Sequence, residues 1–436
     1  STPKPSSAAS DVYKRQPKET PTKNQFRIIV GSYEHNILCV SLDLSNKDIG
    51  PIFTPIFHFQ AHSLSVKTLD ASKKFLVSGS GDEHIRIYDM QNRTEMGNLL
   101  SHEGTITCLK FTQKSIEEEK INKEKLEKGK KLGTNTSDGK WLLSASEDKT
   151  ITVWRTKDWE KFSVLKGHTK RINDLDIHPS NRIAVSISDD HSIRLWNLMS
   201  MKKAGVLKLK DYNQNGQFIR FAGQSHFVVA LTSKILVYDL GIAKVCYEID
   251  VPKRSTIMHM EIESINDEVF VVVGLNDGSL LFYPLAKMRL SIDYDKEYTE
   301  EDFKNMEPEF ILNGHPNRIK SFKFFKNEFS EYLISCSSDG RIVCWDMATK
   351  EVAATYETSE RLTCLTVIDE RIEKMKVSTQ KVTEEEYTKS ELEDELDSDD
   401  EMQYKKIMKG TQDKKRKRNK GGKKINKKRK VEIEMD

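Results

Sequence analysis

Cysteine, proline and long apolar runs are all scarce in this sequence. Six cysteines and eleven prolines are spread over 436 residues, and no two cysteines have the CxxC spacing of a zinc or redox site. No apolar run approaches the roughly 18 residues of a membrane span, and the first 25 residues lack the pattern of a secretory signal. We therefore expect a soluble intracellular protein with buried free thiols and no membrane contact.

Metal and cofactor motifs are also lacking. None of the eleven histidines has a partner at metal-ligand spacing. The "GSGD" at Gly79 is not followed by the helix and Lys-Ser/Thr pair of a phosphate loop. The sequence therefore predicts neither a metal site nor a cofactor.

The small net charge of +3 conceals a polarised C-terminus. Residues 384–401 are acidic, whereas residues 405–430 carry about fifteen basic side chains and almost no acids. Such like-charged blocks repel themselves and usually stay disordered. Nine basic residues there, here called the tail cations, suit nuclear import or contact with RNA phosphates: Lys414, Lys415, Arg416, Lys417, Arg418, Lys427, Lys428, Arg429 and Lys430.

The middle of the chain contains an internal repeat. Four stretches align on a Ser-x-Ser: "SGSGDEHIRIYD" from Ser78, "SASEDKTITVWR" from Ser144, "SISDDHSIRLWN" from Ser186 and "SCSSDGRIVCWD" from Ser335. In each, an acid follows the first serine by four positions, and an aromatic residue follows the acid by six. The pairs are Asp82 with Tyr88, Asp148 with Trp154, Asp190 with Trp196 and Asp339 with Trp345. A histidine precedes each stretch: His62, His102, His168 and His315.

Three weaker copies complete the repeat. "VVVGLNDGSLLFY" keeps Asp277 and Tyr283, and "FVVALTSKILVYD" keeps only the strand pattern and Tyr238. "IIVGSYEHNILCV" at the start has Glu34 and Val40 at the acid and aromatic positions. Seven units result.

Each unit has the pattern of four short strands. Apolar residues alternate or form short β-rich runs, as in "RINDLDI" and "SIRLW", and turn residues separate them. A four-stranded sheet cannot cover both of its faces, so such units stack radially into a propeller. The Gly-His and terminal Trp-Asp signatures resemble WD40 repeats. We therefore expect an all-β, seven-bladed WD40 propeller over residues 25–370.

The two chain ends are expected to close the ring. The first copy begins at its second strand, while "RLTCLTVID" from Arg361 imitates the inner strand "TITCLKF". A C-terminal strand would therefore complete the first blade. Residues 1–24, where "SDVYKRQ" resembles a translated sequencing adapter, and residues 371–436 are expected to be disordered segments outside the propeller.

The recurring Ser, His and Asp invite comparison with a hydrolase. A catalytic set needs to occur once, in a concave site, whereas this set recurs at repeat spacing. We interpret it as a hydrogen-bonded set that fixes each blade, and we expect no enzyme. The residues are His62, Ser78 and Asp82; His102, Ser144, Asp148 and Trp154; His168, Ser186, Asp190 and Trp196; and His315, Ser335, Asp339 and Trp345.

Insertions and a basic rim are the remaining surface features. Residues near 113–139 and 285–310 are expected to emerge as loops opposite the histidines, the first with an exposed helix. Arg171, Arg318 and Arg361 open inner strands and form a candidate rim for an acidic peptide or RNA phosphate. His178, before Pro179, is expected in an exposed loop.

The ordered motifs "IIVGSYEHNILCV", "SGSGDEHIRIYDM", "GTITCLKF" and "RLTCLTV", with the basic tail, resemble one WD-repeat family. These are the fungal maintenance-of-killer proteins and the animal p21-activated-kinase-interacting proteins. The resemblance implies a nucleolar assembly factor that binds ribosomal proteins, other pre-60S assembly factors and pre-rRNA, as a monomer within a larger particle. Two alternatives stay open: an adaptor that restrains a p21-activated-type protein kinase, and a substrate receptor of a ubiquitin ligase.

Overall fold

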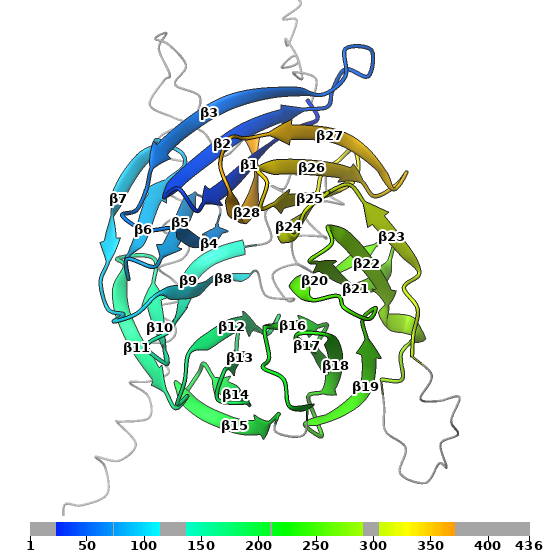
Figure 1. The fold of residues 1–436 in the computed structure, drawn as a ribbon. Helices are drawn as coiled ribbons and strands as arrows, with labels where there is room; N and C mark the ends of the chain where they lie inside the picture. Colours follow the sequence, from blue (N-terminus) through cyan, green and yellow to red (C-terminus); the bar gives the residue numbers. More distant parts are fainter. Residues whose placement is uncertain (1–22, 73, 114–136, 210–211, 291–304, 371–436) are drawn as a thin grey trace, which may run out of the picture. The chain divides into compact units, whose positions relative to one another are not determined.

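A computed structural model of the chain describes residues 23–72, 74–113, 137–209, 212–290 and 305–370. The chain divides into two units, Ser1–Lys374 and Met375–Asp436. The described part of the first unit consists of seven antiparallel four-stranded sheets arranged in a ring (Figure 1). This confirms the seven-bladed propeller. The second unit, with the acidic block and the tail cations, lies outside the described residues.

Blades 2 to 7 follow one another along the chain and each begins with its inner strand, whereas blade 1 takes its inner strand from the C-terminal end. Blade 1 contains β28 (Leu362–Asp369), β1 (Gln25–Ser32), β2 (Asn36–Asp43) and β3 (Ile52–Gln60). Blade 2 contains β4 (Val66–Ala71), β5 (Phe75–Ser80), β6 (Ile85–Asp89) and β7 (Thr94–Leu99). Blade 3 contains β8 (Ile106–Gln113), β9 (Ser137–Ser146), β10 (Thr150–Arg155) and β11 (Glu160–Lys166). Blade 4 contains β12 (Ile172–Ile177), β13 (Ile183–Ser188), β14 (Ser192–Asn197) and β15 (Lys202–Lys208).

The remaining blades have the same order. Blade 5 contains β16 (Phe218–Ala222), β17 (His226–Ala230), β18 (Lys234–Asp239) and β19 (Lys244–Asp250). Blade 6 contains β20 (Ile257–Ile265), β21 (Glu268–Leu275), β22 (Ser279–Pro284) and β23 (Phe310–Asn313), with a short 3-10 helix, η2 (Leu285–Lys287), after β22. Blade 7 contains β24 (Ile319–Lys326), β25 (Glu331–Ser337), β26 (Arg341–Asp346) and β27 (Glu351–Glu357).

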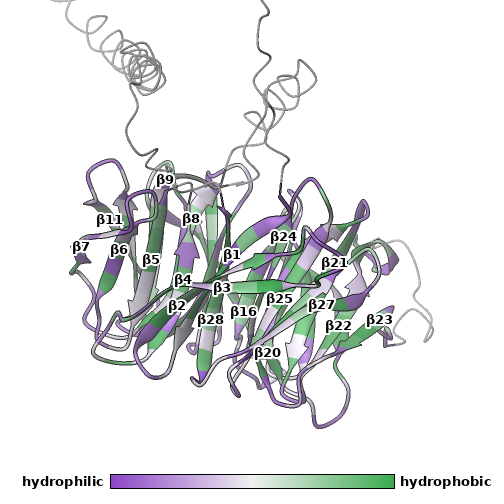
Figure 2. Ribbon diagram, turned by 90° about the horizontal axis from the view of Figure 1, so that it is seen from above, coloured by the Kyte–Doolittle hydropathy of each residue, from purple (hydrophilic) through white to green (hydrophobic). Residues whose placement is uncertain are grey.

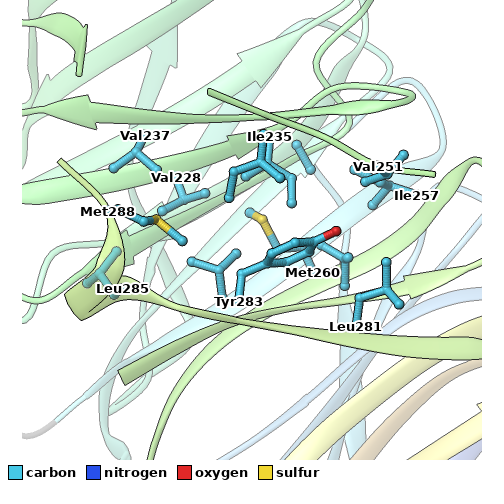
Figure 3. Close-up of a cluster of buried hydrophobic side chains, with 14 of the residues drawn as sticks. Val228, Ile235, Val237, Val251, Ile257, Met260, Leu281, Tyr283, Leu285 and Met288 are labelled. Carbon is cyan, nitrogen blue, oxygen red and sulfur yellow. The ribbon is translucent and has the colours of Figure 1, made fainter. Parts of the chain in front are cut away.

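The core lies between neighbouring blades. The second strands are buried over nearly their whole length, as in β5, while the outer strands such as β15 are mostly exposed. Hydrophilic residues accordingly gather at the loops in Figure 2. Between blades 5 and 6, Val228 and Val237 pack against Met260 and Tyr283 (Figure 3). Blade-to-blade burial of apolar area therefore holds the ring together.

The two ends of the propeller meet in blade 1. β28 pairs with β1 in antiparallel register, from Phe26 opposite Asp369 to Gly31 opposite Cys364. A Cβ on Gly31 would lie 2.6 Å from the Cys364 Sγ, so a larger residue would not fit there. This pairing confirms that a C-terminal strand completes the first blade.

The turn between the second and third strands has a recurrent conformation. Its residue after the acid has a positive φ in six blades, at His35, Glu83, Lys149, His191, Gly278 and Gly340. In the five blades that have an aspartate before this residue, the aspartate accepts the backbone N–H two residues further on, as in Asp148 with Thr150 at 2.9 Å. The aspartate thus compensates a backbone conformation that only glycine adopts without cost.

The N-terminal edge of the propeller extends before the expected start at residue 25. Asn24, placed in the disordered segment, is buried, and its Nδ2 donates to the Tyr332 hydroxyl at 2.7 Å. Its Oδ1 accepts from Asn327 Nδ2 at 2.7 Å. Side chains of blade 7 thus hold Asn24 in place, although the sequence before residue 25 has no strand periodicity.

The two insertions join the expected strands. The first connects β8 to β9 and the second connects β22 to β23. Since strands alternate in direction, the flanking strand ends of both lie on the edge away from the histidines. Residues 114–136, where a helix was expected, and 291–304 lie outside the described residues.

All six cysteines are buried and free, as the sequence predicted. Burial raises the pKa of the Cys246 thiol to about 11 and that of Cys364 to about 12. These thiols are therefore protonated at neutral pH.

None of the described helices is long and apolar enough to cross a membrane.

Candidate functional site

Blades 3 and 4 each contain a complete hydrogen-bonded set. In blade 4, His168 Nδ1 lies 2.9 Å from Asp190 and His168 Nε2 lies 2.8 Å from Ser186 Oγ. Trp196 Nε1 donates to the same Ser186 Oγ at 2.8 Å. The set links the loop before β12 to β13, to the turn after it and to β14.

Blade 3 repeats this geometry. His102 lies 2.8 Å from Asp148 and 2.7 Å from Ser144 Oγ. Trp154 Nε1 donates to Ser144 Oγ at 2.9 Å, and Thr150 Oγ1 donates to Asp148 at 2.7 Å. Burial alone would raise the pKa of Asp148, but the hydrogen bonds from His102 and Thr150 lower it to about 2.

Blade 2 keeps the contacts of the histidine to the serine and the aspartate, but it has a tyrosine at the aromatic position, whose hydroxyl does not bond the serine. His62 Nδ1 lies 3.0 Å from Asp82, and His62 Nε2 lies 2.7 Å from Ser78 Oγ. Tyr88 is buried, and this burial raises the pKa of its hydroxyl to about 12. Burial lowers the pKa of His62 despite the nearby Asp82 carboxylate.

Blade 7 holds the same four residue types but does not bring all of them together. His315 Nε2 lies 2.7 Å from Ser335 Oγ, and Trp345 Nε1 donates to that oxygen at 3.4 Å. Asp339 instead accepts from Asn317 Nδ2 at 3.2 Å, and the buried His315 Nδ1 has no partner. Burial therefore lowers the pKa of His315 to about 4.

The burial of the serine hydroxyls determines what chemistry these hydrogen-bonded sets can perform. Ser78, Ser144, Ser186 and Ser335 are each 0% exposed. A serine nucleophile needs open space for a carbonyl substrate, whereas these hydroxyls already contact a histidine inside a sheet. The geometry therefore ties strands and loops together and offers no nucleophile to a substrate. Among the described residues, no group of three or more His, Cys, Asp and Glu side chains is placed to hold a metal ion.

A ring of charges on the inner strands was not expected from the sequence. The residues that pair with the same position of the second strand alternate in sign around six blades: Asp70, Lys110, Asp176, Arg220, Glu261 and Lys323. Blade 1 has the neutral Thr366 at this position. An alternating ring of seven members needs one neutral member, since two like charges would otherwise be adjacent. Comparing one column of the repeat alignment would have revealed this pattern.

Within this charge ring, Arg220 links three blades through the ion pairs that it makes. It donates to Asp174 on β12 and lies 3.1 Å from Glu261 on β20, so it joins blades 4, 5 and 6. Lys323 lies 3.1 Å from the same Glu261, and Lys110 lies 3.8 Å from Asp176. Burial opposes ionisation of Glu261, but Arg220 and Lys323 hold its pKa well below the usual range.

The three expected rim arginines differ from one another in the structure. Arg171 pairs with Glu147 at 2.7 Å. Arg361 pairs with Glu34 at 3.1 Å and lies over the Tyr33 ring, 4.3 Å from its centroid. Arg318 is exposed, and its contacts in the described part of the chain involve only its backbone carbonyl, which accepts from Ser337.

His178 is not exposed, which makes that expectation wrong. It does follow β12 in a loop, but its Nε2 lies 3.0 Å from the Gln224 carbonyl oxygen and it is 7% exposed. Its ring packs edge-on against Phe221 of the next blade, with centroids 5.0 Å apart. Contact between blades buried a residue whose local sequence indicated a surface turn.

Comparisons with known proteins agree with this architecture. The WD domain, G-beta repeat family matches residues 53–89, 134–155, 159–197 and 306–346. Protein MAK11 of Saccharomyces cerevisiae is 50% identical over 95% of this chain and 99% of its own length. The p21-activated protein kinase-interacting protein 1-like protein of Gallus gallus is 32% identical over 74% of this chain and 76% of its own length. Shk1 kinase-binding protein 15 of Schizosaccharomyces pombe is 22% identical over 78% of this chain and 83% of its own length. The chain therefore belongs to the WD40-repeat family of Protein MAK11 and the p21-activated protein kinase-interacting proteins.

Proposed function

We propose that this protein is a non-enzymatic scaffold in assembly of the large ribosomal subunit and in rRNA processing, acting in the nucleolus. The observation that carries the proposal is the 50% identity to Protein MAK11 along nearly the whole of both chains. The sequence motifs of this family imply an assembly factor of pre-60S particles. A rigid disc whose polar sets are buried suits docking of other molecules better than chemistry.

The disc and the tail have separate roles in this proposal. The propeller holds ribosomal proteins or other assembly factors on its loops, which lie outside the buried sets. The tail cations contact pre-rRNA phosphates, which gives a salt-dependent and sequence-independent contribution to affinity. The residues 405–430 contain no aromatic for base stacking, so the tail adds attraction without sequence readout.

Depletion and purification test this function. A tagged chain should co-sediment with pre-60S particles, and its depletion should lower large-subunit precursors relative to small-subunit precursors. Changing the nine tail cations to glutamine should reduce RNA crosslinking while the protein partners remain. Unchanged large-subunit precursor levels after depletion would contradict the proposal.

A second candidate function is an adaptor that restrains a p21-activated-type protein kinase. The names of the Gallus gallus and Schizosaccharomyces pombe relatives favour it, since both describe kinase binding. It predicts direct binding to a purified kinase regulatory segment without co-sedimentation with pre-ribosomes. A ubiquitin-ligase receptor would instead co-purify with ligase subunits, so mass spectrometry of one tagged purification separates the three functions.

A further inference from the structure

We propose that the histidine-side ends of the inner strands of blades 7 and 2 bind an acidic peptide segment of a partner protein through Lys67, Lys320 and Arg318. These residues are called the mouth cations below. The inference deepens the proposed function, because it names the chemistry of a partner that the disc holds. It rests on that function only for the identity of the partner.

A bulge in each inner strand places the mouth cations. The register shifts between Val66 and Thr68 in β4 and between Ile319 and Ser321 in β24. Lys67 and Lys320 are therefore the residues left out of the strand pairing. Such bulges re-aim a side chain and often occur beside functional sites. The bulge residues in four other blades are neutral, at Thr107, Asn173, Met258 and Thr363.

The two lysines flank one inner strand. β28 packs against both β4 and β24, so Lys67 and Lys320 lie on either side of its bulge residue, Thr363. The Thr363 hydroxyl donates to the Val66 carbonyl oxygen at 2.6 Å, directly before Lys67. Arg318 immediately precedes β24. The mouth cations thus belong to blades 7 and 2, on either side of the inner strand of blade 1.

The mouth cations repel one another without compensation. Burial, together with the like charges of Arg318 and Lys67, lowers the pKa of Lys320. Among the residues that the structure describes, no carboxylate pairs with any of the three, whereas Arg171 and Arg361 on the same side each have a glutamate. An incoming carboxylate would therefore relieve repulsion as well as gain attraction.

The deeper charge ring does not compete for this anion. Its members, such as Arg220 and Lys323, are already paired with carboxylates. The unpaired positive charge is thus at the histidine-side ends of the inner strands, where Lys67 and Arg318 are exposed to solvent.

The surroundings favour a peptide over RNA. Asp339, whose partner is the neutral Asn317, lies in the turn before β26 on the same side of the propeller, and it would repel a backbone that carries a phosphate at every nucleotide. An extended peptide can place one or two carboxylates on the mouth cations and keep its neutral residues near this acid. Leu64, three residues before Lys67, is 51% exposed and offers such a peptide an apolar contact.

A labelled peptide tests the proposal directly. The probe is a fluorescein-labelled twelve-residue peptide with four glutamates and one central leucine, and its matched control replaces the glutamates with glutamine. The protein is the full chain in which the nine tail cations are changed to glutamine, because the tail would also attract the probe. We expect saturable binding of the acidic peptide only, and about a fivefold loss of affinity in Lys67→Gln and in Lys320→Gln. Lys203→Gln, on the exposed outer strand β15, should bind as the parent does.

The outcomes separate this proposal from its rivals and from the proposed function. Absence of binding, or equal affinity in Lys320→Gln and Lys203→Gln, would overturn it. A single-stranded uridine dodecamer that binds the mouth cations more tightly than the peptide would overturn it in favour of RNA. Co-sedimentation with pre-60S particles is scored separately: its absence would contradict the ribosomal function while leaving a measured peptide site intact.

Discussion

His102 Nδ1 lies 2.8 Å from Asp148 although 46 positions of sequence separate the two residues. The intervening segment includes the strand β8 and the first insertion, yet the pair has the geometry of His168 and Asp190 in blade 4, which are 22 positions apart. The repeat geometry is therefore independent of the length of the loop that joins its first two strands.

The Asp148 carboxylate should make stability depend on acid pH. Its pKa is about 2 in the folded chain and 3.8 as the reference value. Its contribution, about 1 kcal/mol once solvent screening is allowed for, is thus present above pH 4 and lost as the pH falls from 4 to 2. Asp148→Asn should be less stable than the parent at pH 6 and differ less at pH 2.5, in urea unfolding. Asp339→Asn is the matched control with a smaller expected effect, because Asp339 does not contact His315.

His315 should destabilise the fold at mildly acidic pH. Its pKa is about 4 when folded and 6.5 as the reference value, so the unfolded chain takes up the proton first. Stability therefore falls as the pH drops from 6.5 to 4, by up to about 3 kcal/mol. In urea unfolding, the free energy of unfolding of His315→Gln should therefore fall less steeply between pH 6.5 and 4 than that of the parent. Identical slopes in variant and parent would contradict the prediction, because they would show that His315 has the same pKa in the folded and unfolded chains.

The indole hydrogen bonds should differ in strength between blades. Trp196 Nε1 donates to Ser186 at 2.8 Å, whereas Trp345 donates to Ser335 at 3.4 Å. Both substitutions to phenylalanine lose buried ring area, about 2 kcal/mol, but Trp196→Phe should cost about 1 kcal/mol more. Thermal or urea unfolding of the two variants measures the difference, and equal losses would contradict the distance argument.

Arg220 should be the most costly member of the charge ring to neutralise. Arg220→Met leaves Asp174 without its arginine and weakens the compensation of Glu261, at a cost of about 4 kcal/mol. Lys323→Met should cost less, because Lys323 is 27% exposed and Glu261 keeps Arg220. A combined Arg220→Met and Asp174→Asn variant should recover part of the loss in urea unfolding. No recovery would indicate that Arg220 acts through packing alone.

The sequence alone determined the features that repeat locally along the chain. Strand alternation, turn residues and the histidine-to-aromatic spacing predicted seven blades, the closing strand after Arg361 and the internal geometry of blades 3 and 4. These features depend on neighbours within one blade, so each copy carries its own signal.

Only the tertiary structure decided which residues of neighbouring blades contact one another and which single side chains are buried or left without a partner. Arg220 meets Glu261 from the next blade, and Phe221 covers His178 from outside its own blade. In blade 7 the required residue types are all present, but Asn317 contacts Asp339 and His315 Nδ1 stays without a partner. Such outcomes depend on which side chains of separate segments are brought close together when neighbouring blades pack, and spacing within one repeat does not encode that.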